Sequence, residues 1–198
     1  MISAIILAAG LSKRMELGNK LLLEKKQTPI IKITLENIKA TKVDEIIIVL
    51  GKSSKSFKNV IEDANIKFFF NSNYKNGISS SIKKGVEKVD ITSEGALICL
   101  ADMPSVKTST YNKIIDAFYK YKKKNIIPYF NNKKGNPVLF NKSYFKLISS
   151  ITGDVGAKNL IRNNRKDFRK LNVSDAGILE DIDSKEQYYN FIKNEKIN

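Results

Sequence analysis

The chain has 198 residues, of which 42% are hydrophobic, and a formal net charge of +15 at pH 7. This length is typical of one domain and this apolar content supports a sizeable core, which excludes a long disordered chain or a fibrous repeat. Because the chain has no histidine, serine–histidine catalysis, cysteine–histidine catalysis and histidine metal sites are excluded.

The first half of the chain predicts strands that alternate with helices. Ile2–Ala8 is an apolar run ending in small residues, which is typical of a buried parallel strand. Thr28 and Pro29 supply an N-cap and a first residue for a helix that continues through Ile38. The elements that follow are a strand at 45–50, a helix at 56–64, a strand at 66–70 and a helix after the Asn76-Gly77 turn.

The second half continues this alternation. Its elements are a strand at 96–101, a helix from Thr108, strands at 125–130 and 137–140, helices at 142–150 and 154–162, a strand at 168–173, and a last helix that Ser184 and Gln187 begin as a capping box. Alternating strands and helices predict a doubly wound, mostly parallel sheet with helices on both faces. No linker or repeat divides the chain, so residues 1–198 are expected to form one α/β domain.

The sequence also bears on location. No apolar stretch approaches the roughly 18 to 20 residues that cross a bilayer, and the N-terminus lacks the pattern of a signal peptide. The single cysteine, Cys99, cannot form an internal disulfide and lies in an apolar run that places it in the core. We therefore expect a cytoplasmic protein with no membrane segment.

The basic charge has two explanations. It could mark a nucleic-acid surface or a site for anionic small molecules. Lysines, however, are scattered with asparagine and isoleucine along the whole chain, and the dense run from Lys120 to Lys124 fits a solvated helix end. Compositional bias accounts for most of the charge, so nucleic acid is not an expected partner.

A first candidate site follows the first strand, at the strand end where open parallel sheets bind ligands. The small residues of this loop allow close backbone approach and an anion nest, while Arg14 and Lys20 add positive charge. Such a loop suits a triphosphate, although it is neither a P-loop nor a G-x-G-x-x-G loop. A solvated turn explains the same residues equally well.

Carboxylates form the second candidate site. Asp102 comes directly after the predicted strand 96–101, where it could hold Mg²⁺ or cap a turn. Asp181 and Asp183 share one side of an extended segment, so both could approach one cation, or they could cap the last helix. Two glycine loops, Gly135-Asn136-Pro137 and 153–158, are either anion sites or ordinary turns.

These clusters, in this order, resemble the molybdopterin-type nucleotidyltransferases, and most closely the molybdenum cofactor cytidylyltransferases. The matching stretches reach from residue 7 to about residue 190 and are LAAGLSKRM with Lys20, Asn71-x-x-Tyr74-x-x-Gly77 with Ser81, LADMP, GNPVLF, GDVGAK and DIDSKEQY. The resemblance implies a Rossmann-like, Mg²⁺-dependent transferase that joins CMP from CTP to the terminal phosphate of molybdopterin cofactor and releases pyrophosphate. A molybdenum hydroxylase would then receive the product.

The resemblance also implies roles for individual residues. The nucleotide would be bound by Leu7, Ala8, Ala9, Gly10, Ser12, Arg14, Lys20, Asn71, Gly77 and Ser81. Arg14, Lys20 and Asp102 would be catalytic, with Asp102 as the principal metal ligand and Asp183 or Asp181 as the second. The acceptor would be bound by Gly135, Asn136, Pro137, Gly153 and Asp154.

Three departures from the family pattern are visible. Glu16-Leu17 precedes Gly18 and moves Lys20 one position along, Asn136 replaces a histidine, and Ser184-Lys185-Glu186-Gln187 replaces Thr-Pro-Glu-Asp. The loop with Ala9 resembles the CTP-using branch, since guanylyltransferases carry a second glycine there. The alternatives are a transferase for a sugar phosphate or other phosphorylated acceptor, and a non-catalytic molybdenum cofactor accessory protein.

Overall fold

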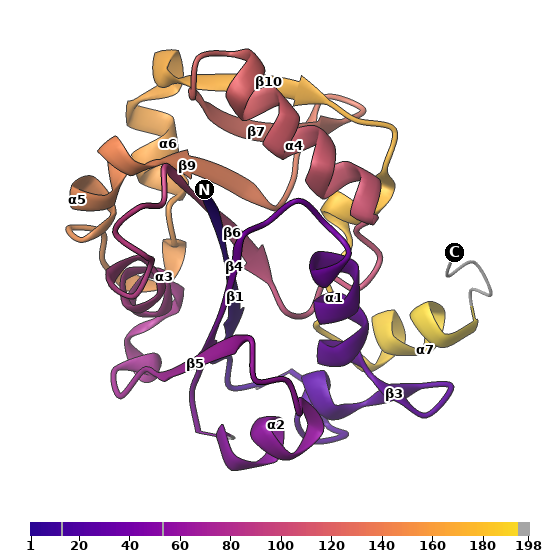
Figure 1. The fold of residues 1–198 in the computed structure, drawn as a ribbon. Helices are drawn as coiled ribbons and strands as arrows, with labels where there is room; N and C mark the ends of the chain where they lie inside the picture. Colours follow the sequence, from indigo (N-terminus) through magenta and orange to yellow (C-terminus); the bar gives the residue numbers. More distant parts are fainter. Residues whose placement is uncertain (13, 53, 194–198) are drawn as a thin grey trace.

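A mixed sheet with helices on both faces forms the body of the protein in the computed structural model, which describes residues 1–12, 14–52 and 54–193 (Figure 1). Its strands are β1 (Ile2–Ala8), β4 (Glu45–Leu50), β5 (Ile66–Phe70), β6 (Gly95–Leu100), β7 (Asn125–Phe130), β8 (Lys133–Lys134), β9 (Val138–Asn141) and β10 (Phe168–Asn172). Their order is β10-β7-β9-β6-β1-β4-β5, and β8 pairs with β7.

The expected doubly wound, mostly parallel fold is confirmed. β1 pairs in parallel with β4 and β6, β4 with β5, and β7 with β10. Only β9 and the short β8 run antiparallel to their neighbours among the described strands of this sheet. A separate hairpin, β2 (Glu24–Lys25) with β3 (Thr28–Pro29), was not predicted.

Helices cover the two faces of the sheet through two separate cores. On one face Ala4 and Ile6 of β1 join the core that includes Leu35, and on the other Ile5 and Ile82 pack together. This alternation is the period of two that a strand imposes. The helices are α1 (Ile30–Lys39), α2 (Ser54–Val60), α4 (Thr108–Lys120) and α7 (Lys185–Lys193) on the first face, and α3 (Ile78–Glu87), α5 (Phe145–Ile148) and α6 (Lys158–Asn163) on the second (Figure 1).

The central position of β1 sets where a ligand can bind. After β1 the chain moves outward through β4 and β5, and it then returns to place β6 on the other side of β1. The loops after β1 and β6 therefore leave the sheet in opposite directions, and a crevice opens between their carboxyl ends. The loop with Gly10 and the segment with Asp102 both begin at this point.

Several predicted boundaries are corrected. Thr28 does not cap α1: it lies in β3, and the N-cap is Pro29, which makes no side-chain hydrogen bond. The helix predicted from 154 begins at Lys158, because Gly153 and Gly156 adopt positive φ angles and leave only a 3-10 turn, η4 (Gly153–Val155), before it. The helix predicted at 142–150 is likewise reduced to α5 behind a 3-10 turn, η3 (Lys142–Tyr144).

Two other expectations concern Cys99 and the membrane. Cys99 is 1% exposed, as expected for a core residue, and burial raises the pKa of its thiol. No helix in the described ranges is long and apolar enough to span a bilayer.

Helix α3 lies so close to the sheet that Gly85 has no room for a side chain. A Cβ there would come within 2.3 Å of Cγ2 of Ile5. We expect Gly85→Ala to lower the free energy of unfolding by about 1–3 kcal/mol through overpacking, despite the better helix propensity of alanine. Urea unfolding measures the change, with Glu87→Ala on the exposed face of α3 as the control. A Gly85→Ala protein as stable as the wild type would contradict this close packing.

Candidate functional site

Lys20, Asp102 and Asp183 meet at the carboxyl ends of β1 and β6. The Lys20 Nζ atom lies 2.5 Å from Asp102 Oδ2 and also donates to Asp183 Oδ1. The Arg14 guanidinium donates to the other oxygen of Asp183, Oδ2. The Lys20 side chain is only 10% exposed, whereas that of Arg14 is 75% exposed. One buried ammonium thus bridges two carboxylates from distant parts of the chain.

The backbone of Lys20 is held by its own loop. Lys20 begins the 3-10 helix η1 (Lys20–Leu22), which Asn19 caps by accepting a hydrogen bond from Leu21 N at 3.1 Å. Lys20 N donates to Ser12 Oγ at 3.3 Å, and Ser12 has a positive φ of 50°. The insertion of Glu16-Leu17 therefore does not carry Lys20 away from the carboxylates. Lys13 of the same loop lies outside the described residues.

Helix α1 holds the segment that carries Asp102. Thr34 Oγ1 donates to Ala101 O at 2.9 Å, and Asn37 Nδ2 donates to Pro104 O at 3.0 Å. These bonds occupy backbone carbonyls on both sides of Asp102, since the turn after β6 leaves them without strand partners. The position of Asp102 is consequently tied to the core rather than to a free loop.

The start of α7 holds Asp183. The predicted capping box forms: Gln187 N donates to Ser184 Oγ at 3.2 Å, and Gln187 Oε1 accepts from Ser184 N at 2.9 Å. The same Oε1 accepts from Asp183 N at 2.9 Å, and Ile182 N donates to Asp102 O at 2.9 Å. Ser184 is thus the cap, which leaves the Asp183 side chain for Lys20 and Arg14.

The pKa values of Asp181 and Asp183 are shifted in opposite directions. Burial raises the pKa of Asp183, but Lys20 and Arg14 outweigh it, so the net pKa lies below the ordinary value. The pKa of Asp181 is raised, mainly by burial and then by repulsion from Asp183 and Asp102. Burial lowers the pKa of the Lys20 ammonium, but the contacts with Asp102 and Asp183 outweigh burial. The net pKa therefore lies above the ordinary value. The ammonium and the Asp183 carboxylate are therefore both charged at neutral pH.

The donor set fits a divalent metal that also takes ligands from a substrate. The carboxylate oxygens of Asp102 and Asp183 converge on one point. The Lys20 ammonium lies at this point, so the position favours a cation. Within the described ranges no group of three or more acidic, cysteine or histidine side chains is arranged to hold a metal by itself. Mg²⁺ commonly binds through one or two carboxylates, with phosphate oxygens and water completing its shell. A nucleotide would supply these phosphates.

The loop after β1 is open enough for a ligand to approach. Leu7 and Ala8 end the strand and are buried, as is Ala9. Gly10 is exposed, and nothing lies within 4 Å of the position that a Cβ would occupy there. The roles predicted for these residues in binding a nucleotide stay predictions.

The residues predicted near the base have partners inside the chain. Asn71 Nδ2 donates to Ser80 Oγ at 2.9 Å and to Ser81 Oγ at 3.0 Å, and Asn71 Oδ1 accepts from Asn73 N at 3.0 Å. These bonds tie the end of β5 to the start of α3. Asn71 also lines a cavity of about 420 Å³ between α3 and residues 151–153. Its role in binding the base stays a prediction.

The two glycine loops predicted to face the acceptor lie in different places. Asn136 N donates to Ile178 O at 2.9 Å, and Val138 pairs with Ile98 of β6, so residues 135–137 lie beside the carboxyl end of β6. The Asn136–Pro137 bond is cis. Asp154 Oδ1 instead accepts from Ile78 N at 3.0 Å, across from Gly77, and so caps α3. The structure thus gives Asp154 a structural contact that does not depend on a bound acceptor substrate.

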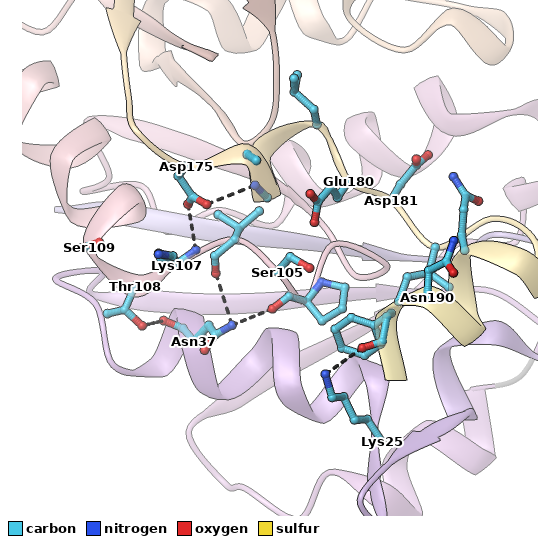
Figure 2. Close-up of a pocket in the computed structure, with 18 of the residues that line it drawn as sticks. Lys25, Asn37, Ser105, Lys107, Thr108, Ser109, Asp175, Glu180, Asp181 and Asn190 are labelled. Carbon is cyan, nitrogen blue, oxygen red and sulfur yellow. Dashed lines mark hydrogen bonds between the residues drawn. The ribbon is translucent and has the colours of Figure 1, made fainter. Parts of the chain in front are cut away.

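A larger cavity, which the sequence did not reveal, lies behind the Asp181 segment. Its volume is about 1140 Å³, and it is lined by parts of α1, α4 and α7 together with the 3-10 helix η6 (Ala176–Leu179) (Figure 2). On its wall Asp175 Oδ2 accepts from Lys107 N at 3.0 Å and from Thr110 Oγ1 at 2.6 Å. Asp175 therefore fastens η6 to the start of α4. Its Asp-x-Gly spacing to Gly177 was the available signal for this turn.

Comparisons with known proteins identify the family of the chain. Residues 4–169 match the family model described as the MobA-like NTP transferase domain. The nicotine blue oxidoreductase of Paenarthrobacter nicotinovorans is 23% identical over 205 residues, which cover 96% of each chain. A probable molybdenum cofactor guanylyltransferase of Methanosarcina mazei is 32% identical over 123 residues, which cover 60% of this chain and 52% of that protein.

Solved structures share the whole fold. Rv0371c of Mycobacterium tuberculosis superposes with a TM-score of 0.87 at 23% identity, covering 97% of each chain. A second structure of that protein, described as a complex with manganese, gives a TM-score of 0.84 at 22% identity over 98% of each chain. At this identity the likeness establishes the fold alone.

Asp183 should stabilise the fold in a pH-dependent way. We expect Asp183→Asn to lower the free energy of unfolding at pH 7 by about 1 kcal/mol, and the difference from the wild type to shrink towards pH 3. The folded-state pKa of Asp183 is below its ordinary value of 3.8. Its stabilisation is therefore present above that ordinary value and is lost as the pH falls through the lowered pKa.

Urea unfolding at pH 7 and pH 3 measures this effect. Asp116→Asn is the matched control, because Asp116 makes an exposed pair with Lys42 and should contribute little. A stability difference for Asp183→Asn that is the same at both pH values would contradict the assignment.

Proposed function

The chain belongs to the MobA-like NTP transferase family, and from this premise we propose that it transfers CMP from CTP to the terminal phosphate of molybdopterin cofactor. The reaction releases pyrophosphate and depends on Mg²⁺. The observation that carries this proposal is the convergence of Lys20, Asp102 and Asp183 beside the open loop after β1. The relative named as a molybdenum cofactor guanylyltransferase supports the acceptor class.

The proposed reaction is an in-line displacement. An oxygen of the terminal phosphate of the acceptor attacks the α-phosphorus of CTP and forms a new phosphorus–oxygen bond. The bond from the α-phosphorus to the oxygen that bridges to the β-phosphorus breaks, and pyrophosphate leaves with that electron pair. Because the attacking phosphate is anionic at neutral pH, no side chain has to remove a proton, which agrees with a chain that has no histidine.

The residues of the chain position and neutralise the reactants. The backbone from Leu7 to Ser12 would receive the triphosphate, and the charges of Arg14 and Lys20 would offset the negative charge that moves to pyrophosphate. Asp102 and Asp183 would hold Mg²⁺, which when bound orients the phosphates and neutralises their charge. We prefer Asp183 over Asp181 as the second metal ligand, because Asp183 and Asp102 both form an ion pair with the same Lys20 ammonium. The structure described as a manganese complex supports a divalent metal.

The base and acceptor sites complete the proposal. Asn71, Gly77 and Ser81 would lie near the base and ribose, and the resemblance of the Ala9 loop to the CTP-using branch supports CTP. Residues 135–137 are the better-placed acceptor loop, because they lie beside the carboxyl end of β6. Gly153 and Asp154 would act mainly through α3. In this proposal a cytoplasmic molybdenum hydroxylase receives the product.

Pyrophosphate release tests the proposal. The purified protein is incubated with Mg²⁺ and Mo-molybdopterin, and CTP, GTP, ATP and UTP are compared. Release with CTP alone is expected, and release with GTP alone would assign the guanylyl reaction instead. Release only when a sugar phosphate replaces the pterin would identify another acceptor. Absence of release with every nucleotide, from folded protein, would favour the accessory role.

Asp102→Asn should reduce turnover by at least about 100-fold, since it removes the principal carboxylate for the metal. The backbone bonds on both sides of Asp102 should keep the segment in place, so the circular dichroism spectrum is expected to match the wild type. Asp116→Asn removes an exposed carboxylate and should leave the rate unchanged. Turnover near the wild-type rate in folded Asp102→Asn would remove Asp102 from the site.

A further inference from the structure

The position of the Lys20 ammonium is unusual for a residue expected to bind a triphosphate. Its Nζ atom lies between the carboxylates of Asp102 and Asp183 instead of projecting into an open phosphate site. The Lys20 side chain is 10% exposed, against 18% and 21% for the two aspartates. All three charged groups are thus largely shielded from water and satisfy one another.

We propose that Lys20 occupies the metal position between Asp102 and Asp183 in the free protein, and that a bound triphosphate draws it away, so that nucleotide and metal bind cooperatively. This inference rests on the proposed function, because it assigns the sequence of events at the same site. It concerns Lys20 itself and can be tested without turnover.

The metal and the Lys20 ammonium would use the same carboxylate oxygens. Lys20 Nζ is 2.5 Å from Asp102 Oδ2, and Mg²⁺ binds carboxylate oxygens at about 2.0–2.1 Å. An ion bound to the same two oxygens, Asp102 Oδ2 and Asp183 Oδ1, would compete with the Lys20 ammonium for them. Two positive centres at one pair of oxygens would repel each other strongly, so in this proposal the metal enters between the aspartates as Lys20 leaves.

The charges of the cluster favour the replacement of Lys20 by another cation over its departure without a replacement. Among the described residues, Asp102 and Asp183 form ion pairs with Lys20 and Arg14, and Asp181 lies close enough to both aspartates for their charges to repel. Removal of Lys20 alone would leave these carboxylates to repel one another, whereas its replacement by a divalent ion would restore the opposing positive charge. The flexible four-carbon stem of lysine permits such a movement without a change of backbone.

The loop that holds the backbone of Lys20 is also the loop expected to receive the triphosphate. Lys20 N is hydrogen-bonded to Ser12 Oγ, in the same loop that would receive the triphosphate. A phosphate oxygen bound in this loop would offer the Lys20 ammonium an alternative anionic partner. Binding of the triphosphate then frees the aspartates, and by linkage the metal strengthens nucleotide binding by the same factor.

Titration with Mn²⁺ alone tests the inference, with free Mn²⁺ followed by electron paramagnetic resonance. We expect Lys20→Met to bind Mn²⁺ at least about fivefold more tightly than the wild type. Arg14→Met is the matched control, since it also removes a cation that contacts Asp183 but does not lie between the two aspartates. Its effect should be clearly smaller. Lys20→Arg, which keeps a bridging cation, should bind as weakly as the wild type.

Further variants separate the possible results. Adding Asp102→Asn to Lys20→Met should abolish the gain, which assigns the bound Mn²⁺ to this site. If Lys20→Met does not fold, Lys20→Gln carries the same expectation. Mn²⁺ affinity equal to or below that of the wild type, or an equal gain in Arg14→Met, would overturn the inference. Because no nucleotide is present, this result is independent of whether the protein releases pyrophosphate.

Discussion

The ion pairs of Lys20 with Asp102 and Asp183 are the interaction on which the rest of the site depends. They join a loop after β1, a turn after β6 and the segment before α7, which are far apart in the sequence. Each segment is fixed by its own backbone bonds: Asn19 caps η1, Thr34 holds Ala101, and Gln187 holds Asp183. The charged side chains are therefore brought together by a frame that the core supports.

Much of this arrangement follows from local sequence pattern. Apolar runs identify the strands because buried parallel strands need no alternation, and the carboxyl-end rule places Lys20 and Asp102 at one edge of the sheet. The sequence alone does not say which of Asp181 and Asp183 faces Lys20, because that depends on how α7 docks. That docking rests on contacts such as Tyr188 Oη with Glu24 O, which join residues remote in sequence.

The structure also separates residues that the family resemblance groups together. Asn71 and Asp154 both use their side chains to hold the start of α3, so their polarity already has an explanation within the fold. The side chains of Lys20, Arg14, Asp102 and Asp183 instead form ion pairs with one another. Sequence pattern does not distinguish these cases, because a polar residue in a glycine-rich loop looks the same whether it bonds to the chain or to a ligand.

The most direct measurement is anomalous X-ray scattering from crystals grown with Mn²⁺ and a non-hydrolysable CTP analogue. We expect an anomalous peak between the carboxylates of Asp102 and Asp183, with Lys20 Nζ moved onto the phosphates. A peak elsewhere, or Lys20 still between the two aspartates with the nucleotide bound, would contradict the central claim that these three residues form one exchangeable cation site.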